Sequence, residues 1–435
     1  MGSRLPFVHN RSSHVAVTWK DLVIIWGGTA DEHRWPSEFD PNAVYCHMDG
    51  KWIAKTTCGD VPGIRENAGA EVLDDTMYLM FGEYEGWRIC DGIYALDLNS
   101  WRWTKLNPKG TPPFKCSSLS TWIHNGKFYG FGGKISKDDM PSDWDSYPDY
   151  LVVTEITEPS GMDPFTNQLF CYNVAANCWE WPSACGDMPP PRYNHTTIVC
   201  ANNNDAFICG DAAILFGGQG IIRERLGHMN DLYILRLDDM VWIRAHRSMI
   251  SRGIPRKRAE HSLTLVSSKS AVLFGGEKQR SSSPLIPSDD DFGHGDCWIL
   301  NTERLLNYDF DLFHPSYLWK RCWYQENRPS SLDATRLCHR AAVEPVSKRL
   351  WILGGAIGWM MHEPYPTEII SMSFNSAAPL RLLAMESALS HFDPTHPVWE
   401  AHKIPQHLRT ELEDRRSHVE EERRTGMKGQ RYNKY

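Results

Sequence analysis

The sequence predicts an all-β fold, a six-bladed β-propeller followed by a short helical segment at the C-terminus. Two observations lead to this prediction. An apolar run that ends in paired glycines recurs six times along the 435 residues, and histidine and tryptophan marks recur at matching places. Four short strands per repeat form one twisted blade, and a ring of blades leaves few free strand edges.

The glycine-ended run sets the number of blades. In its second copy Glu83 replaces the second glycine. From the first glycine of each copy, the spacings are 55, 50, 85, 58 and 79 residues. The short spacings match the kelch repeat period of ~50 residues, and the long ones imply insertions in blades three and five. The six runs are residues 22–28, 77–82, 128–133, 213–218, 271–276 and 350–355.

Other marks keep the same period. Four blades carry Arg-x-x-His before the glycines, and a strand with tryptophan follows the glycines at Trp52, Trp103, Trp179 and Trp242. We expect the histidines to make structural hydrogen bonds, the arginines to tie neighbouring blades, and the tryptophans to be buried between blades. The sixth repeat lacks a tryptophan strand, so we expect Leu5 to Val8 to supply it and close the ring. The four pairs are Arg11 and His14, Arg192 and His195, Arg258 and His261, and Arg336 and His339.

Composition excludes several functional classes. The net charge of −8 argues against nucleic acid or an anionic membrane as the main partner, and no apolar run reaches the ~18 residues of a membrane span. The 12 cysteines form no Cys-x-x-Cys pair, and the first residues hold no signal-type apolar stretch, so we expect reduced thiols in a cytoplasmic and/or nuclear protein. No catalytic motif and no metal set stands out, and carboxylates in the 134–165 insertion lack calcium-loop spacing, so we expect no enzyme, cofactor or metal.

The pattern changes after the sixth repeat. Residues 378–389 predict a helix that begins near Pro379, and residues 404–412 predict a second short helix. The predicted parts are therefore a kelch β-propeller at 1–376, a helical segment at 377–412 and a charged tail at 413–435, which we expect to be disordered.

These motifs together resemble a known family. Residues 11–17, 26–28, 228–232 and 261–264, with the long third-blade insertion, are similar to the kelch domain-containing substrate receptors of cullin-2 RING ubiquitin ligases. The resemblance implies a receptor that holds the C-terminal tails of target proteins in the central pocket of the propeller. It also implies partners, elongin B/C and cullin-2, that bind the C-terminal helices.

The helices fit the two binding boxes of that family. The elongin-binding box corresponds to Pro379, Leu380, Ala384 and Ala388, and the cullin-2 box to Ile404, Pro405 and Leu408. An exposed apolar helix face is a helix-in-groove ligand. The alternatives are that both helices cap the propeller, and that the chain is a kelch scaffold or cytoskeletal interaction protein without a ligase link.

The pocket departs from the family pattern. The family's best-known member has arginines where this chain has Gln219 and His228, and Ser-Trp where it has Ala259 and Glu260. Basic loop residues give the predicted mouth a positive charge suited to a peptide carboxylate, so we expect C-terminal peptides to bind with a specificity other than diglycine. The candidate pocket residues are Lys134, Gln219, Arg223, Arg225, His228, Arg258 and Glu260.

Overall fold

The computed structural model divides into two compact units, Met1–Ser373 and Phe374–Tyr435. The predicted closing strand Leu5 to Val8, the helical segment and the charged tail lie outside the residues that the structure describes. The described residues are 11–30, 40, 42–48, 51–84, 88–139, 145–154, 163–200, 210–222, 225–247, 253–278, 293–307, 315–322, 336–356 and 369–372.

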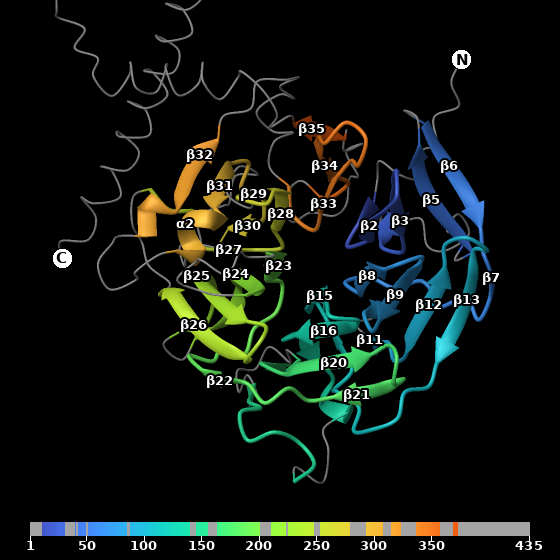
Figure 1. The fold of residues 1–435 in the computed structure, drawn as a ribbon, viewed down its shortest axis with the longest axis horizontal. Helices are drawn as coiled ribbons and strands as arrows, with labels where there is room; N and C mark the ends of the chain where they lie inside the picture. The colour runs from blue at the N-terminus through green and yellow to red at the C-terminus, as the bar shows by residue number, and fades with distance from the viewer. Residues whose placement is uncertain are drawn as a thin grey trace, which may run out of the picture. The chain divides into compact units, whose positions relative to one another are not determined.

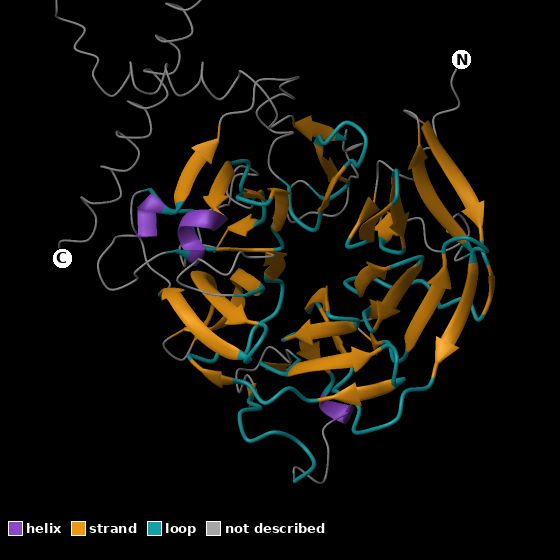
Figure 2. Ribbon diagram, in the orientation of Figure 1, coloured by secondary structure: helices purple, strands orange, loops and turns teal. Residues whose placement is uncertain are grey.

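Six sheets of the first unit are the predicted blades, and they lie around a common centre (Figure 1). Within each blade the strands are antiparallel and follow the chain from the innermost strand outward. Almost every described element is a strand, as Figure 2 shows. The prediction of an all-β kelch propeller is confirmed.

The first three blades have four core strands each, and the second gains β7 (Cys58–Gly59), which pairs in parallel with its outermost strand. Blade one contains β2 (Val15–Trp19), β3 (Leu22–Trp26), β5 (Ala43–Met48) and β6 (Lys51–Thr56). Blade two contains β8 (Gly69–Leu73), β9 (Thr76–Met80), β12 (Ile93–Asp97) and β13 (Arg102–Leu106). Blade three contains β15 (Ser120–His124), β16 (Lys127–Phe131), β20 (Leu169–Asn173) and β21 (Cys178–Glu180).

The last three blades follow the same plan, except that three strands of blade six lie in the described part of the chain. Blade four contains β23 (Thr196–Cys200), β24 (Ala212–Ile222), β25 (Arg225–Arg236) and β26 (Val241–His246), with β22 (Cys185–Gly186) in parallel beside β26. Blade five contains β28 (Ser262–Ser267), β29 (Ser270–Phe274), β31 (Cys297–Asn301) and β32 (Trp319–Cys322). Blade six contains β33 (Arg340–Val343), β34 (Leu350–Leu353) and β35 (Ile370–Met372).

Short strands and helical turns complete the described elements. The short strands pair the segment before an inner strand with the segment after the paired glycines, and we call them the rim pairs. They include β1 (Arg11–Ser12), β4 (Thr29–Ala30), β14 (Cys116–Ser117), β17 (Lys134–Ile135), β27 (Arg258–Ala259) and β30 (Glu277–Lys278). The others are β10 (Glu83–Tyr84), β11 (Arg88–Ile89), β18 (Val153–Thr154), β19 (Phe165–Thr166), η1 (Lys137–Asp139), α2 (Thr302–Leu306) and η3 (Pro315–Tyr317).

The hydrophobic cores lie between successive blades. One cluster joins blades one and two, and another joins blade one to blade six through Val23, Ile25 and Leu353. Trp103 and Trp242 are buried as predicted, whereas Trp52 and Trp179 are half-buried. Trp103 of blade two lies 5.7 Å, between ring centroids, from Trp26 of blade one. Buried aromatic area of this kind stabilises each blade against its neighbour.

The register of the second repeat differs from the sequence interpretation. In five blades the glycine pair adopts left-handed backbone, with φ of 69° and 80° at Gly27 and Gly28. In blade two the pair is Phe81 and Gly82, with φ of 55° and 96°. Phe81 therefore replaces the first glycine, and Glu83 follows the pair instead of belonging to it. The second position needs glycine, because a Cβ on Gly82 would meet Glu66 O at 2.7 Å.

The arginine prediction was wrong in one respect, since the guanidinium groups act within their own blade. Arg192 donates to Gly217 O at 3.0 Å and is ion-paired with Asp231 at 2.8 Å, both in blade four. The ties between blades use backbone instead, because Gly133 N–H of blade three donates to Arg192 O at 2.9 Å. Gly355 N–H makes the same bond to Arg11 O at 2.8 Å, and it joins blade six to blade one.

Three of the four repeat histidines make the structural hydrogen bonds that the sequence predicted, and in the described part of the chain His14 lacks the hydroxyl partner of the others. His195, His261 and His339 pair through Nε2 with a hydroxyl of the preceding blade, at 2.8, 2.9 and 2.9 Å. Burial holds the pKa of His195 and His261 well below its usual value, so these rings stay neutral. The hydroxyls belong to Ser120, Thr196 and Ser262.

Candidate functional site

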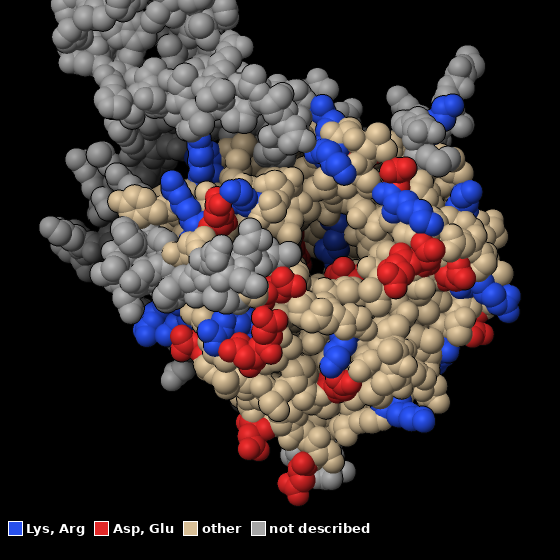
Figure 3. All heavy atoms as spheres, in the orientation of Figure 1, with Lys and Arg blue, Asp and Glu red and all other residues tan. Residues whose placement is uncertain are grey.

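A cavity of about 210 Å³ lies at the centre of the propeller, and all six inner strands contribute to its wall. Figure 3 shows an opening at the centre of the ring, with a basic side chain inside it and acidic side chains at its edge. The cavity lies where the inner strands begin, which is the end that also carries the rim pairs. It is therefore the candidate binding site.

A ring of six residues, one before the inner strand of each blade, surrounds this cavity, and we call it the collar. Its members have left-handed backbone with φ between 52° and 58°, as at Asn67 and Ser118. Each of five collar N–H groups donates to the collar carbonyl of the preceding blade, at 2.8 to 3.0 Å. One of these bonds, from Ser13 to Cys338, joins blades one and six at 2.8 Å. The collar consists of Ser13, Asn67, Ser118, Asn194, Glu260 and Cys338.

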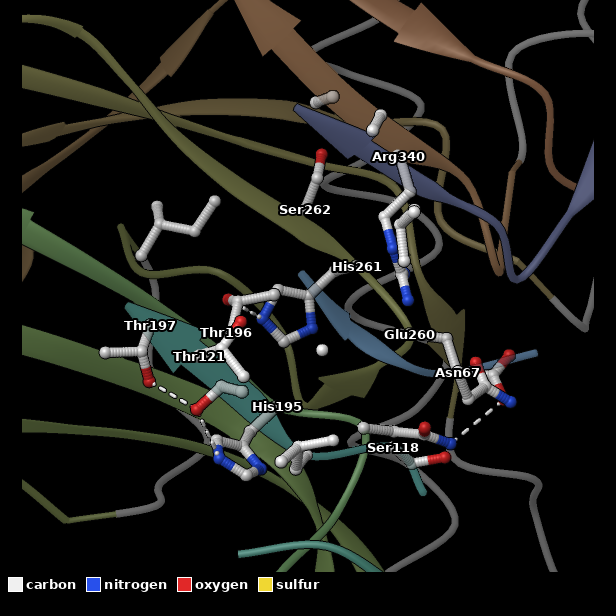
Figure 4. Close-up of a pocket in the computed structure, with 18 of the residues that line it drawn as sticks. Asn67, Ser118, Thr121, His195, Thr196, Thr197, Glu260, His261, Ser262 and Arg340 are labelled. Carbon is white, nitrogen blue, oxygen red and sulfur yellow. Dashed lines mark hydrogen bonds between the residues drawn. The ribbon is translucent and has the colours of Figure 1, made fainter. Parts of the chain in front are cut away.

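Because the collar backbone is bonded around the ring, its side chains are available to form the site. The Asn194 amide donates to one Glu260 oxygen at 3.0 Å, and the Cys338 thiol lies 2.9 Å from the other. The Asn67 amide donates to Glu83 at 2.8 Å. Figure 4 shows that Asn67, Ser118 and Glu260 lie on one side of the cavity. The collar is thus polar, and its carboxylate is held by neighbouring blades.

The predicted pocket residues separate into two rim groups and one collar residue. Lys134 is paired with Glu83 at 3.3 Å, and its side chain is 16% exposed. Gln219 and His228 come together on Glu277, at 3.3 and 3.0 Å. Glu260 belongs to the collar and lines the cavity. The structure therefore brings Gln219 and His228 into contact and places Lys134 in a different part of the rim.

The remaining predicted residues lie elsewhere. Arg258 is fully buried in blade five, where it is paired with Asp296 at 2.7 Å, and it does not line the cavity. Arg225 is exposed at the start of β25. Arg223 lies outside the described residues, as do the elongin-box residues Pro379, Leu380, Ala384 and Ala388 and the cullin-box residues Ile404, Pro405 and Leu408.

The charge around the cavity differs from the expected positive mouth. Carboxyl groups stand near it, and burial followed by the charge of Glu83 raises the pKa of Glu66 to about 7. Burial and the charge of Glu277 likewise raise the pKa of Glu260 to about 7. The raised pKa values leave Glu66 and Glu260 partly protonated near neutral pH, and with Lys134 nearby the mouth is mixed in charge.

Two cavity residues escaped the sequence analysis, and the first is Glu71 on inner strand β8. Its carboxylate accepts a hydrogen bond from Thr121 of blade three at 3.0 Å. Burial raises the pKa of Glu71 to about 8, which keeps the group neutral at pH 7. The sequence feature that could have identified Glu71 is its position two residues after Gly69, on the strand face that turns toward the centre of the propeller.

The second missed residue is Arg340, the first residue of inner strand β33. Its side chain points into the cavity in Figure 4, and its Nη1 donates to His339 O at 3.3 Å. The charged residues among those that line the cavity are Glu71, Glu260 and Arg340. The sequence feature that could have identified Arg340 is the residue type directly after Arg-x-x-His. This residue is threonine in blade four, serine in blade five and arginine in blade six.

Clusters of metal-ligating side chains and apolar helices of membrane-spanning length are both absent from the described residues. Among them, no group of three or more histidine, cysteine, aspartate or glutamate side chains could hold a metal. Within the same ranges, no helix has both the length and the apolar character of a membrane span. The groups that the cavity offers to a ligand are its polar collar, its carboxyl groups and the guanidinium of Arg340.

A six-bladed ring with a polar central cavity defines a kelch-repeat propeller, a class of domain that mediates protein–protein interaction and is generally non-catalytic. The KLHDC2/KLHL20/DRC7 Kelch-repeats domain matches residues 6–140 and 157–378, and the chain belongs to this family. Kelch domain-containing protein 2 of Bos taurus is 26% identical over 415 residues, which cover 92% of this chain and 88% of that protein.

Two further relatives mark the range of similarity. Kelch domain-containing protein 1 of Mus musculus is 24% identical over 310 residues, which cover 66% of this chain and 68% of that protein. Host cell factor 1 of Homo sapiens is 26% identical over 364 residues, which cover 81% of this chain and 16% of that protein. The propeller therefore also resembles one part of a much longer chain.

Proposed function

We propose that the protein is the substrate-recognition subunit of a cullin-2 RING ubiquitin ligase in the cytoplasm or nucleus. In this proposal the propeller binds the C-terminal tails of target proteins in its central cavity. The segment 377–412 docks on elongin B/C and cullin-2. The observation that supports it most is the cavity itself, which all six blades line and to which blades two to six contribute polar side chains.

The shape of the site favours a chain end over a folded surface. Pockets for drug-sized ligands have volumes of about 300–1,000 Å³, so a cavity of about 210 Å³ suits the last residues of a peptide. Backbone amides of a peptide need polar partners inside a protein, and the side chains of Asn67, Ser118 and Asn194 line the wall.

The ligase part of the proposal depends on the C-terminal sequence. Leu380, Ala384 and Ala388 recur every four residues, which places them on one face of a helix. The Ile404-Pro405 pair follows at the spacing of a cullin-2 box. The order of the two boxes after a kelch propeller supports a helix that binds in a partner's groove.

A second candidate function is a kelch scaffold without a ligase link. The similarity to host cell factor 1 favours it, because that similarity equals the one to kelch domain-containing protein 2 at 26%. The two candidates differ in their partners, and the receptor alone requires elongin and cullin-2.

Capture of the full chain from cells, followed by detection of elongin B, elongin C and cullin-2, separates the candidates. We expect all three to be captured with the parent chain. If other partners of the propeller are captured without elongin, the receptor function is rejected in favour of the scaffold function.

A further inference from the structure

We propose that Arg340 is the anchor for the terminal carboxylate of the bound peptide, which reaches into the central cavity instead of stopping at the loops. This inference rests on the proposed function, because it names the residue that would read the C-terminal end. The proposed anchor lies in blade six. The best-known member of the resembling family has arginines in blade four at the positions where this chain has Gln219 and His228.

The repeat itself marks Arg340 as an exception. In blades three, four and five the equivalent residues are Ser120, Thr196 and Ser262, and each hydroxyl pairs with the histidine of the following blade. Arginine has no hydroxyl to take this place. Among the described residues no hydroxyl pairs with the ring of His14, the histidine that follows blade six in the ring. Of the four histidines at this repeat position, His14 is thus the one without a hydroxyl partner within the described ranges, and Arg340 stands where that hydroxyl would be.

Arg340 forms no ion pair within 4.0 Å in the described part of the chain, although the Glu260 carboxyl group of the collar interacts with its charge. The guanidinium donates a hydrogen bond to the carbonyl of the adjacent residue, His339. The two Glu260 oxygens make hydrogen bonds with Asn194 and Cys338, so Glu260 acts on Arg340 through its charge and does not form a two-pronged pair with it. Because the guanidinium fork is not filled by a carboxylate of the described fold, an incoming anion would be favoured at this point.

Contrast with the other buried arginines supports this reading. Arg192 and Arg258 each form a two-pronged pair with an aspartate of their own blade, with bonds of 2.7 to 3.0 Å. Their forks are therefore fully used by the fold. The fork of Arg340 offers a ligand carboxylate the same paired geometry.

The acidic neighbours do not exclude an anion. Glu71 stays neutral at pH 7 because burial raises its pKa to about 8, so its hydroxyl can act as a donor. Glu83 and Glu277 at the rim are paired with Lys134 and His228. Glu260 lines the same cavity, and burial raises its pKa to about 7, so it is partly protonated at neutral pH. An approaching carboxylate therefore meets carboxyl groups that are protonated or hydrogen-bonded and one basic side chain, Arg340.

The test uses the full chain and two pools of fluorescent ten-residue peptides with randomised last three positions, one as free acids and one as C-terminal amides. Binding is measured by fluorescence anisotropy. We expect the parent chain to favour the acid pool about 10- to 100-fold, the range for a hydrogen bond between charged groups. Arg340→Ser should bind both pools equally, while Arg340→Lys should keep part of the preference.

Folding and position are controlled separately. Serine restores the hydroxyl that blades three and five carry, so Arg340→Ser should melt no lower than the parent chain. Arg225→Ser, at an exposed loop-four arginine, should leave the acid preference unchanged. Loss of the preference in Arg225→Ser, with Arg340→Ser unaffected, would move the anchor to loop four and overturn the inference.

Two other outcomes separate this inference from the proposed function. If the parent chain binds acids and amides equally, the cavity still receives peptides and the carboxylate anchor is wrong. If neither pool binds to the parent chain, the peptide-receptor function itself is wrong, whatever Arg340 does.

Discussion

The seam between blades six and one can be opened by one added methyl group. Gly354 has φ of 60°, and a Cβ built on it would overlap the carbonyl oxygen of Arg11. Gly354→Ala must therefore move the two blades apart. Two backbone bonds cross this seam, Gly355 N–H to Arg11 O and Ser13 N–H to Cys338 O, both at 2.8 Å.

A matched control isolates the seam from backbone strain. Gly126 has φ of 71°, and nothing lies within 4 Å of a Cβ built on it. Left-handed backbone costs a non-glycine residue roughly 1–2 kcal/mol, and this cost is shared by Gly126→Ala and Gly354→Ala. The two seam bonds are worth about 0.5–1.5 kcal/mol each, so Gly354→Ala should be less stable than the control by about 1–3 kcal/mol.

Urea unfolding of the full chain measures this difference. The midpoint should fall further for Gly354→Ala than for Gly126→Ala, with the slope against urea unchanged. Amide exchange should also rise in β33 and β2, the inner strands on either side of the seam. Equal midpoints for the two variants would refute the reasoning, because the ring closure would then contribute nothing beyond backbone strain.

Three further predictions concern the tail, the cavity and the N-terminus. Leu380→Asp should abolish elongin capture while the propeller stays folded, because it puts a charge in an apolar groove. Ile404→Ala with Pro405→Ala should weaken only the capture of cullin-2. Retained elongin capture by Leu380→Asp would reject the elongin-box assignment. Burial raises the pKa of Glu71 from 4.5 to about 8, so the folded chain keeps a proton that the unfolded chain loses, and stability falls as pH rises between these values. Glu71→Gln should therefore gain stability over the parent between pH 5 and pH 8 in urea unfolding, and a gain that does not change with pH would contradict this cause. Removal of residues 1–9 should lower the melting temperature by several degrees if Leu5 to Val8 closes the ring, and an unchanged melt would reject that strand.

The sequence was sufficient for the fold because each blade repeats the same chemistry. Glycine at left-handed positions and tryptophan between blades are requirements of geometry, so they recur and can be counted. The predicted register of the second repeat was wrong at Phe81. A left-handed phenylalanine is rare, so the repeat pattern matched Gly82 to the first glycine of the pair, whereas Gly82 occupies the second position. The backbone φ values, which no sequence pattern states, corrected it.

The site was harder to predict because it depends on departures from the repeat. Lys134, Gln219 and His228 were found from their position after the glycines, yet their partners Glu83 and Glu277 come from neighbouring blades. Arg258 fitted a basic pocket by type, and its burial beside Asp296 could be read only from the structure. Pairing between blades decides which charges remain available, and it joins residues far apart in the chain.

The collar separates two tasks that most binding sites combine. Its backbone bonds set the spacing of the blades, and they use N–H and C=O groups that every residue type except proline supplies. The collar side chains do not set the spacing of the blades, and the six positions hold serine, asparagine, glutamate and cysteine. A change of recognition at one collar residue therefore leaves the ring's geometry in place, so the propeller can acquire new ligands one blade at a time.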